Sequence, residues 1–358
     1  MTVFTFFTIS SRVVCGMLLL TEMRIVHAES QILEVGMLPQ SLNYPVASIE
    51  FVGPRDGWAH NMEALWRTRD GGKTWDIVTI PLHNLSACHF ESPDLGWILV
   101  SSDQPPALLY RTSDGGKTWL KQSPLPAFNP IFFMPGGFVG WVGGLKLSNP
   151  PPQRRGQGCI FPPNPSLLQV QLFHTADAGK SWSRQVVPNS GGCPLSSIRF
   201  QTLSEGIAVA GHHIFHTRDG GTTWSPSTYT NTCRNRQWIK TESSEDIHMF
   251  SYDDKQTWLG SSSGFVLKSA DGGETWCVEK IPGEIGVGGG FGEFGSLYFV
   301  TPKHGYILGI DHHIHETQDG GASWSTLSGL AQVDAFFCGY GNCWAASERL
   351  YRLENAFR

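Results

Sequence analysis

The feature that most constrains the fold of this chain is a nine-residue segment that occurs six times. It reads RTRDGGKTW at 67–75, and related segments stand at 111–119, 174–182, 216–224, 268–276 and 316–324. We call these six segments the boxes. Self-similarity at a regular spacing is typical of solenoids, arrays and propellers. We therefore expect a fold assembled from copies of one small unit.

The residues before each box predict the structure of that unit. An alternating apolar and polar segment, a glycine step and a second alternating segment precede the box, as in 48–72, 196–221 and 296–321. Period-two alternation bounded by Gly, Asp and Pro indicates strands joined by tight turns. This pattern predicts four strands per unit, with the box joining the third strand to the fourth.

The composition of the boxes favours a tight turn over a reaction site. Central glycines allow positive φ, while the Asp carboxylate and the Ser or Thr hydroxyls can bond backbone amides that the turn leaves unpaired. The terminal Trp supplies a large apolar side chain for burial between neighbouring sheets. We assign a structural role to Thr68, Asp70, Gly72, Trp75, Asp114, Trp119, Asp177, Trp182, Asp219, Trp224, Asp271, Trp276, Asp319 and Trp324.

A second series of residues counts the units. A Trp, or once Ile and once Tyr, recurs at the second-strand positions 58, 97, 141, 207, 258, 306 and 344, which gives seven units for six boxes. The seventh unit ends before its fourth strand, and an unpaired strand edge promotes aggregation. Residues 32–39 resemble the fourth strands at 76–81 and 277–282. We predict an all-β, seven-bladed β-propeller whose ring is closed by this N-terminal strand.

The domain organisation follows from the same count. Arg12 precedes an apolar run at 13–20, and small residues at 26–28 suit a signal peptidase, so we predict a signal peptide over 1–28. Residues 29–358 then form a single propeller, with no apolar run long enough to span a membrane in the mature chain. The expected localisation is periplasmic or secreted. The blade cores are expected near 46–81, 86–126, 130–188, 195–228, 245–282, 294–329 and 333–358, the last together with 31–39.

Charge and cysteine usage narrow the chemistry further. A formal net charge of -5 gives no reason to expect nucleic acid as a partner. Cys338 and Cys343 flank a predicted hairpin turn, where opposed positions fall within disulfide reach. The sequence does not fix the pairing of Cys159, Cys193, Cys233 and Cys277.

The boxes resemble the Asp-box, or bacterial neuraminidase repeat, S/T-x-D-x-G-x-T-W. The longer pattern, GWA followed by T-x-DGG-x-TW, resembles the photosystem II assembly and stability factor group of exported seven-bladed propellers. The likeness covers nearly all of 31–358, and it departs at Ala178, at Ala322 and in the missing seventh box. Asp-boxes also occur in sialidases and other glycosidases. The resemblance therefore implies the fold and leaves the function open.

Loop lengths nominate one face of the propeller for binding. The second-to-third turns of units 2 and 3 are lengthened, and the blade links at 229–246 and 283–295 are expected on the same face. Long loops on a rigid scaffold commonly carry function. We predict a basic partner-binding patch there, formed by Arg154, Arg155, Arg234, Arg236 and Lys240 with Trp238 as a contact anchor. Ordinary solvated loop charge is the alternative interpretation.

Catalysis and cofactors find little support in the sequence. The paired histidines His212, His213, His312 and His313 are weak metal candidates, because an intervening blade separates the two pairs. We expect neither a metal nor another cofactor. The Arg-Ile-Pro segment that sialidases carry is absent, and no motif requires catalysis. The sequence favours a non-enzymatic propeller that binds a protein partner; the alternative is a sialidase-like or glucan-active glycoside hydrolase with a carbohydrate ligand on its funnel face.

Overall fold

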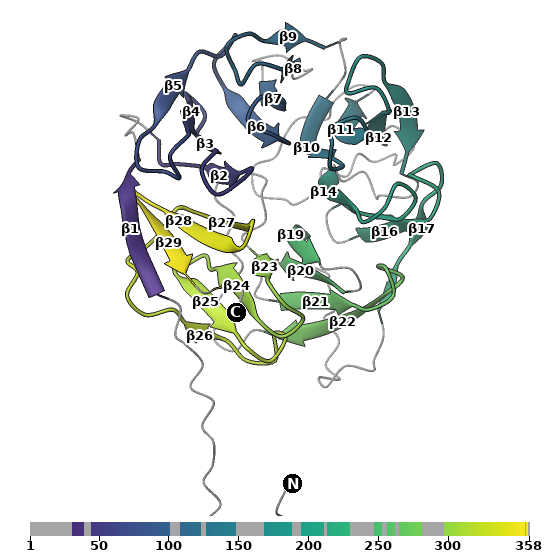
Figure 1. The fold of residues 1–358 in the computed structure, drawn as a ribbon. Coiled ribbons are helices and arrows are strands. Elements are labelled where there is room, and N and C mark those ends of the chain that lie inside the picture. Colours follow the sequence, from purple (N-terminus) through teal and green to yellow (C-terminus); the bar gives the residue numbers. More distant parts are fainter. Residues whose placement is uncertain are drawn as a thin grey trace, which may run out of the picture.

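Seven sheets arranged around one axis make up the structure, a computed structural model (Figure 1). It describes residues 31–38, 44–100, 108–122, 127–147, 168–187, 195–210, 213–229, 247–252, 256–261, 265–280, 297–354 and 356. Within these ranges the chain is all-β, and it contains no helix of the length and apolarity that crossing a membrane requires. The predicted seven-bladed propeller is therefore confirmed. The predicted signal peptide, residues 1–28, lies outside the described ranges.

The blades are numbered 1 to 7 in the chain order of their innermost strands. From the axis outward, blade 1 consists of β2 (Ser48–Phe51), β3 (Gly57–His60), β4 (Leu65–Thr68) and β5 (Asp76–Val78), and blade 2 of β6 (Leu85–Phe90), β7 (Gly96–Val100), β8 (Leu108–Thr112) and β9 (Leu120–Lys121). Blade 3 consists of β10 (Ala127–Phe133), β11 (Gly140–Leu147), β12 (Leu168–Thr175) and β13 (Ser183–Val186), and blade 4 of β14 (Leu195–Phe200), β15 (Gly206–Ala210), β16 (His213–Thr217) and β17 (Ser225–Pro226). Blade 5 consists of β19 (Ile247–Tyr252), β20 (Thr257–Ser261), β21 (Phe265–Ser269), β22 (Thr275–Lys280) and β18 (Thr228–Tyr229). Blade 6 consists of β23 (Leu297–Phe299), β24 (Gly305–Leu308), β25 (Ile314–Thr317) and β26 (Ser325–Thr326). Blade 7 consists of β27 (Ala335–Gly339), β28 (Asn342–Ala346), β29 (Arg349–Glu354) and β1 (Gln31–Met37).

Two blades take their outermost strand from a distant part of the chain. In blade 5, β18 from the preceding link pairs in parallel with β22. In blade 7, β1 pairs antiparallel with β29, in a register that runs from Gln31 opposite Glu354 to Met37 opposite Arg349. The sheet that ends the chain thus also contains the first described strand, which Figure 1 shows beside β29.

An aromatic stack joins each of five blades to the next. The Trp on the second strand of one blade lies flat on the Phe that ends the inner strand of the following blade, with ring centroids 3.5 to 4.0 Å apart. The stacked pairs among the described residues are Trp58–Phe90, Trp97–Phe133, Trp141–Phe200, Trp258–Phe299 and Trp344–Phe51. The last pair connects blade 7 to blade 1. The sequence identified the tryptophans as core residues but not their Phe partners.

In five blades a glycine precedes the second-strand Trp, Ile or Tyr and makes room for the Phe ring of its own blade. Gly96 is paired with Phe90, and a Cβ atom on Gly96 would lie 2.2 Å from that ring. Gly140 has the same relation to Phe133, at 2.3 Å. The box Trp of the blade then meets the Phe edge-on, as Trp119 does with Phe90 at 6.4 Å. One Phe is therefore enclosed by three elements.

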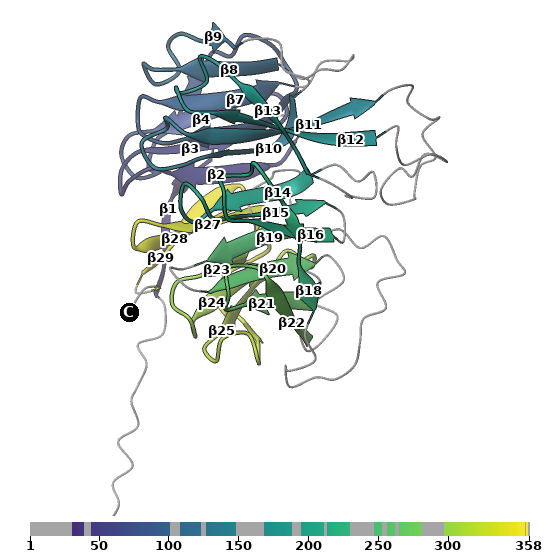
Figure 2. The same ribbon diagram turned by 90° about the vertical axis from the view of Figure 1, so that its right-hand side faces the viewer.

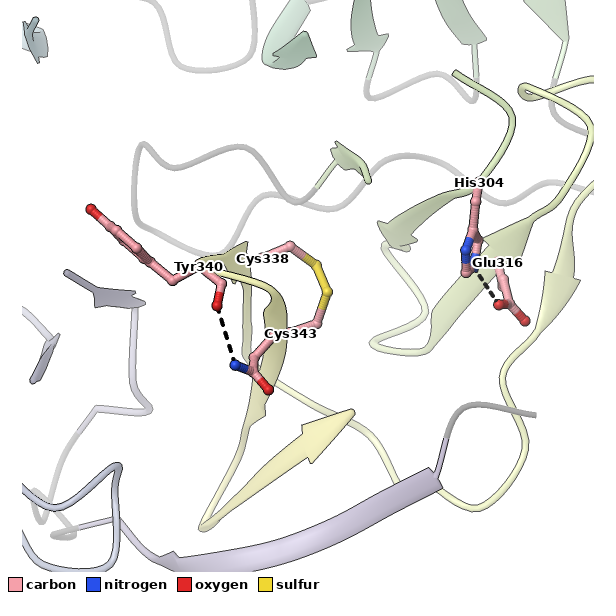
Figure 3. Close-up of a disulfide and its surroundings, with 6 residues drawn as sticks. His304, Glu316, Cys338, Tyr340 and Cys343 are labelled. Carbon is pink, nitrogen blue, oxygen red and sulfur yellow. Dashed lines mark hydrogen bonds and ion pairs between the residues drawn. A yellow bond between two sulfur atoms is a disulfide. The ribbon is translucent and has the colours of Figure 1, made fainter. Parts of the chain in front are cut away.

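A cation from the third strand packs on the ring of two of these tryptophans. The guanidinium of Arg67 lies 4.8 Å from the Trp58 ring, and the ammonium of Lys268 lies 5.2 Å from the Trp258 ring. Blade 6 differs, because Glu316 stands in this position, opposite Tyr306. There the imidazole of His304 approaches Tyr306 at 4.9 Å while its Nε2 lies 2.6 Å from Glu316 Oε1 (Figure 3).

A double-mutant cycle on Phe51 and Trp344 tests the stack between the last blade and the first. Each substitution to Ala should lower the free energy of unfolding by about 3–5 kcal/mol, because a large buried ring is lost. The pair should show a coupling of about 0.5–1.5 kcal/mol, beyond the loss of buried area. Urea unfolding monitored by circular dichroism measures both. Phe51 with Trp97, which lies at another interface, is the control and should be additive; additivity at Phe51 and Trp344 would contradict the stack.

Burial of His60 on β3 predicts a pH dependence of stability. The side chain is fully buried, and this burial lowers the pKa of His60 to about 4 from 6.5, against a smaller opposing effect of the Asn61 backbone. The unfolded chain gains a proton near pH 6.5 that the folded chain takes up only near pH 4. Stability should therefore fall by about 3 kcal/mol as the pH drops through this window. His60→Phe should remove that part of the dependence in urea unfolding measured across the window, and an unchanged profile would contradict it.

Candidate functional site

The box residues form one hydrogen-bonded turn, described here for 111–119. Thr112 Oγ1 donates to Asp114 Oδ1 at 2.9 Å, and the amide and hydroxyl of Thr118 donate to the two carboxylate oxygens at 2.9 and 2.5 Å. The amide of Gly116 donates to Thr112 Oγ1 at 2.8 Å. Gly115 and Gly116 both adopt positive φ, 72° and 84°, which a tight turn of this kind requires. The other five boxes have the same Asp-centred hydrogen bonds.

Each box also fastens neighbouring turns. The amide of Gly115 donates to the carbonyl of Asp94, in the first-to-second-strand turn of the same blade, and Arg67 of blade 1 donates to the carbonyl of Gly115. In the third box Ala178 takes the place of this glycine, with φ 61°, and donates to the carbonyl of Phe138. Boxes and first-to-second-strand turns therefore share one face of the propeller, which we call the box face. The opposite face is the loop face.

The box carboxylates are poorly suited to acid or base catalysis. Hydrogen bonds from the hydroxyl and amide of Thr118 lower the pKa of Asp114 to about 2. Those from Ser181 do the same for Asp177. A carboxylate with so low a pKa stays ionised at neutral pH, and its acceptor capacity is taken up by the turn.

The predicted basic patch lies outside the described ranges. This concerns Arg154, Arg155, Arg234, Arg236, Trp238 and Lys240. The hairpin that carries the longest insertion is described at its base, where β11 and β12 are paired from Gly140 opposite Thr175 to Leu147 opposite Leu168. These two strands extend past the neighbouring blades toward the loop face (Figure 2). The lengthened second-to-third turn of blade 3 therefore begins on the face predicted from loop lengths.

Two of the histidines predicted as weak metal candidates contact backbone carbonyl groups. His312 adopts φ 62°, and its Nδ1 lies 3.2 Å from the carbonyl oxygen of Val333. His313 Nδ1 lies 2.9 Å from the carbonyl oxygen of Asp311. His213 begins β16, and His212 lies outside the described ranges. In the described part of the chain, no three His, Cys, Asp or Glu side chains are grouped so that they could hold a metal ion.

The disulfide predicted between Cys338 and Cys343 is present. The two residues face each other in the β27–β28 hairpin, with sulfurs 2.01 Å apart (Figure 3). Cys277 is also disulfide-bonded. Cys159, Cys193 and Cys233 themselves lie outside those ranges.

A cluster of titratable side chains near the axis was not predicted from the sequence. His89 Nδ1 lies 3.4 Å from Glu50 Oε1, and its Nε2 lies 3.9 Å from Glu91 Oε2. Glu50 also accepts a hydrogen bond from the amide of Phe90 at 3.1 Å, and Glu91 accepts one from the amide of Gly136 at 2.7 Å. Burial raises the pKa of Glu91. The cluster connects blades 1, 2 and 3 at the axis end of the box face.

Exposed apolar side chains stand on the box-face turns near this cluster. Phe138, Leu203 and Tyr340 are 67%, 63% and 60% exposed, on the first-to-second-strand turns of blades 3, 4 and 7. Partial burial, and to a smaller extent the charges of Glu91 and Glu50, raise the pKa of Tyr340. Blade 7, which carries Tyr340, adjoins blade 1, which carries Glu50.

Comparison with known proteins identifies the architecture. No protein-family model and no curated protein sequence matches the chain. Among solved structures it is similar to YCF48 bound to a D1 peptide, with 18% identity, a TM-score of 0.60, and coverage of 92% of this chain and 98% of that one. YCF48 from Cyanidioschyzon merolae gives 17% identity, a TM-score of 0.60, and coverage of 90% and 98%. The GH74 xyloglucanase from Xanthomonas campestris gives 12% identity, a TM-score of 0.54, and coverage of 89% and 52%, so this chain spans about half of that enzyme. At such identities the likeness shows the fold alone.

The low pKa of Asp114 predicts a contribution of the box to acid stability. A carboxyl whose folded pKa lies below its ordinary value of 3.8 stabilises the fold above that pH, and the benefit is lost as the pH falls toward 2. Asp114→Asn should therefore lower the Tm at neutral pH, with a gap to wild type that narrows between about pH 4 and pH 2. Calorimetry measures the gap. Asp76→Asn, at an exposed outer-strand carboxylate, is the matched control, and an equal effect of the two variants would contradict the role of the box.

Proposed function

We propose that this chain is an exported, non-enzymatic propeller that binds a protein partner as an assembly or stability factor. The observation that carries the proposal is the near-complete overlap with YCF48, since one seven-bladed ring accounts for 98% of that protein. One of those structures holds a peptide. The boxes are the most prominent polar motif, and their carboxylates are hydrogen-bonded within the turns, which makes them poor catalytic groups.

Partner binding is proposed to use the loop face. The extension of β11 and β12 supports this, because these strands point away from the short turns of the box face and the longest insertion separates them in the sequence (Figure 2). The arginines at 154, 155, 234 and 236 would read carboxylates of the partner through paired hydrogen bonds.

Export is supported by the cysteine chemistry. Disulfides form and persist in oxidising compartments, and Cys338–Cys343 is one in the described chain. Together with the predicted signal peptide, this favours a periplasmic or secreted protein.

One observation favours a glycoside hydrolase as the second candidate. Glu91 has a raised pKa and Glu50 lies on the other side of the His89 ring, so two carboxyl groups in different environments stand near the axis. Such a pair is what acid catalysis by glycosidases uses. The half-length overlap with GH74 enzymes weakens this candidate, because the ring here matches only part of such an enzyme.

Charge reversal on the loop face tests the leading proposal. The variant with Glu at 154, 155, 234 and 236 should lose the proteins that the wild-type chain captures from the extracytoplasmic fraction of its own cells, as measured by quantitative mass spectrometry. Arg55→Glu with Lys303→Glu, at exposed box-face positions, is the matched control and should retain them. Equal capture by all three proteins would contradict the loop face as the binding surface. Turnover of xyloglucan or sialosides that Glu91→Gln abolishes would instead support the hydrolase.

A further inference from the structure

We propose that the box face holds a second docking site, which takes a basic polypeptide segment with apolar neighbours. Tyr340 and Phe138 are its apolar anchors, and Glu91 is the acceptor of a Lys or Arg side chain. The site lies on the face opposite the loop arginines, so it goes beyond the function proposed above.

The conformation of Tyr340 is the first observation. Tyr340 and Gly341 form the turn between β27 and β28, with φ of 52° and 75°. Turns of this kind favour Asn, Asp or Gly, since a bulky residue in the left-handed region is strained. The side chain of Tyr340 is 60% exposed, so burial does little to offset that strain. A strained residue held in place by its surroundings points to function rather than stability.

The hairpin that carries Tyr340 is rigid. The Cys338–Cys343 disulfide closes it, and Asn342 donates a side-chain hydrogen bond to the carbonyl of Tyr340 at 3.3 Å. Figure 3 shows the Tyr340 ring pointing away from the disulfide. An aromatic ring presented by a fixed backbone loses little entropy on binding, which is typical of contact anchors.

Phe138 is presented in the same way. Its carbonyl accepts a hydrogen bond from Ala178 of the third box at 2.8 Å, and Met134 bonds Val139 across the base of the turn at 2.8 Å. The ring itself is 67% exposed. The box thus fixes the backbone and leaves the aromatic side chain in solvent.

Glu91 connects the two anchors. Its carboxylate accepts a hydrogen bond from the amide of Gly136, in the turn that carries Phe138, and its blade lies between those of the two anchors. The anchors belong to blades 3 and 7, and the carboxylates belong to blades 1 and 2 between them. A ligand that contacts both rings must therefore extend across several blades, which suits a polypeptide better than a small cation.

The charge of these turns selects the ligand. From blade 7 through blade 3, the first-to-second-strand turns contain three carboxylates, Asp56, Glu91 and Asp94, against one cation, Arg55. A Lys or Arg side chain would make charge-assisted hydrogen bonds to Glu91 and could also stack on either ring. An acidic segment would be repelled. Basic residues next to Leu or aromatic residues are the chemistry that fits.

Selection from a phage-displayed library of random short linear peptides on the immobilised full-length protein tests this site. We expect enrichment of Lys or Arg beside Leu or aromatic residues. The enriched peptide, synthesised and measured by fluorescence anisotropy, should bind Tyr340→Asn about tenfold or more weakly. Asn suits the left-handed turn, so the Tm of this variant should not fall. Glu91→Gln keeps an acceptor for Gly136 but removes the charge, and it should weaken binding and reduce its salt dependence.

Matched controls separate this site from other surfaces. Ile77→Asn and Leu120→Asn remove equally exposed apolar side chains from outer strands and should leave the Kd unchanged. The loop-face charge-reversal variant should also bind the peptide normally. Selection without a basic consensus, or binding that tolerates both Tyr340→Asn and Glu91→Gln, would overturn the proposal. If the wild-type chain captures no protein from its own cells but still binds the selected peptide, only the loop-face function is refuted. If the loop-face variant loses native capture but no selected peptide depends on Tyr340 or Glu91, only this site is refuted.

Discussion

The fold depends on the stacking of a tryptophan from one blade on a phenylalanine of the next. This contact explains the glycine before Trp58, Trp97 and Trp141, because a Cβ atom there would overlap the Phe ring of the same blade, as at Gly96 and Phe90. It also explains the position of the box Trp, which meets the same ring edge-on. Because each stack joins two blades, a single blade cannot bury its own aromatic residues. The ring is therefore stabilised by its interfaces, as in other repeat architectures.

How far the sequence predicts this structure depends on how local each contact is. The box turn, the seven units and the Cys338–Cys343 pairing lie within short segments, so spacing and residue type were sufficient to predict them. The Phe partners and the cluster of Glu50, His89 and Glu91 join residues of neighbouring repeats, which no local pattern reveals. A comparison of equivalent positions would have shown that a polar residue precedes Phe51 and Phe90. The strain at Tyr340 depends on turn geometry and was likewise hidden.

The two faces of the ring differ in how firmly their turns are held and in how much the turn lengths vary. On the box face, hydrogen bonds from the boxes fix the first-to-second-strand turns, as Ala178 fixes Phe138, so side chains there are presented on a rigid base. On the loop face, the lengths of the second-to-third turns and blade links vary widely in the sequence. Rigid presentation favours recognition by a few anchors. Variable loops favour recognition by charge and shape.

The pairing of β1 with β29 sets an order of events for the newly made chain. The first described strand leaves the ribosome long before the strand it joins, and it has no sheet partner until nearly the whole polypeptide has been produced. Contacts between such distant segments form slowly, which prolongs the time during which the nascent chain must be kept from association. A free β1 can also be donated to the last blade of a second molecule. Exchange of this strand is the expected route by which the ring would dimerise when several copies of the chain fold close together.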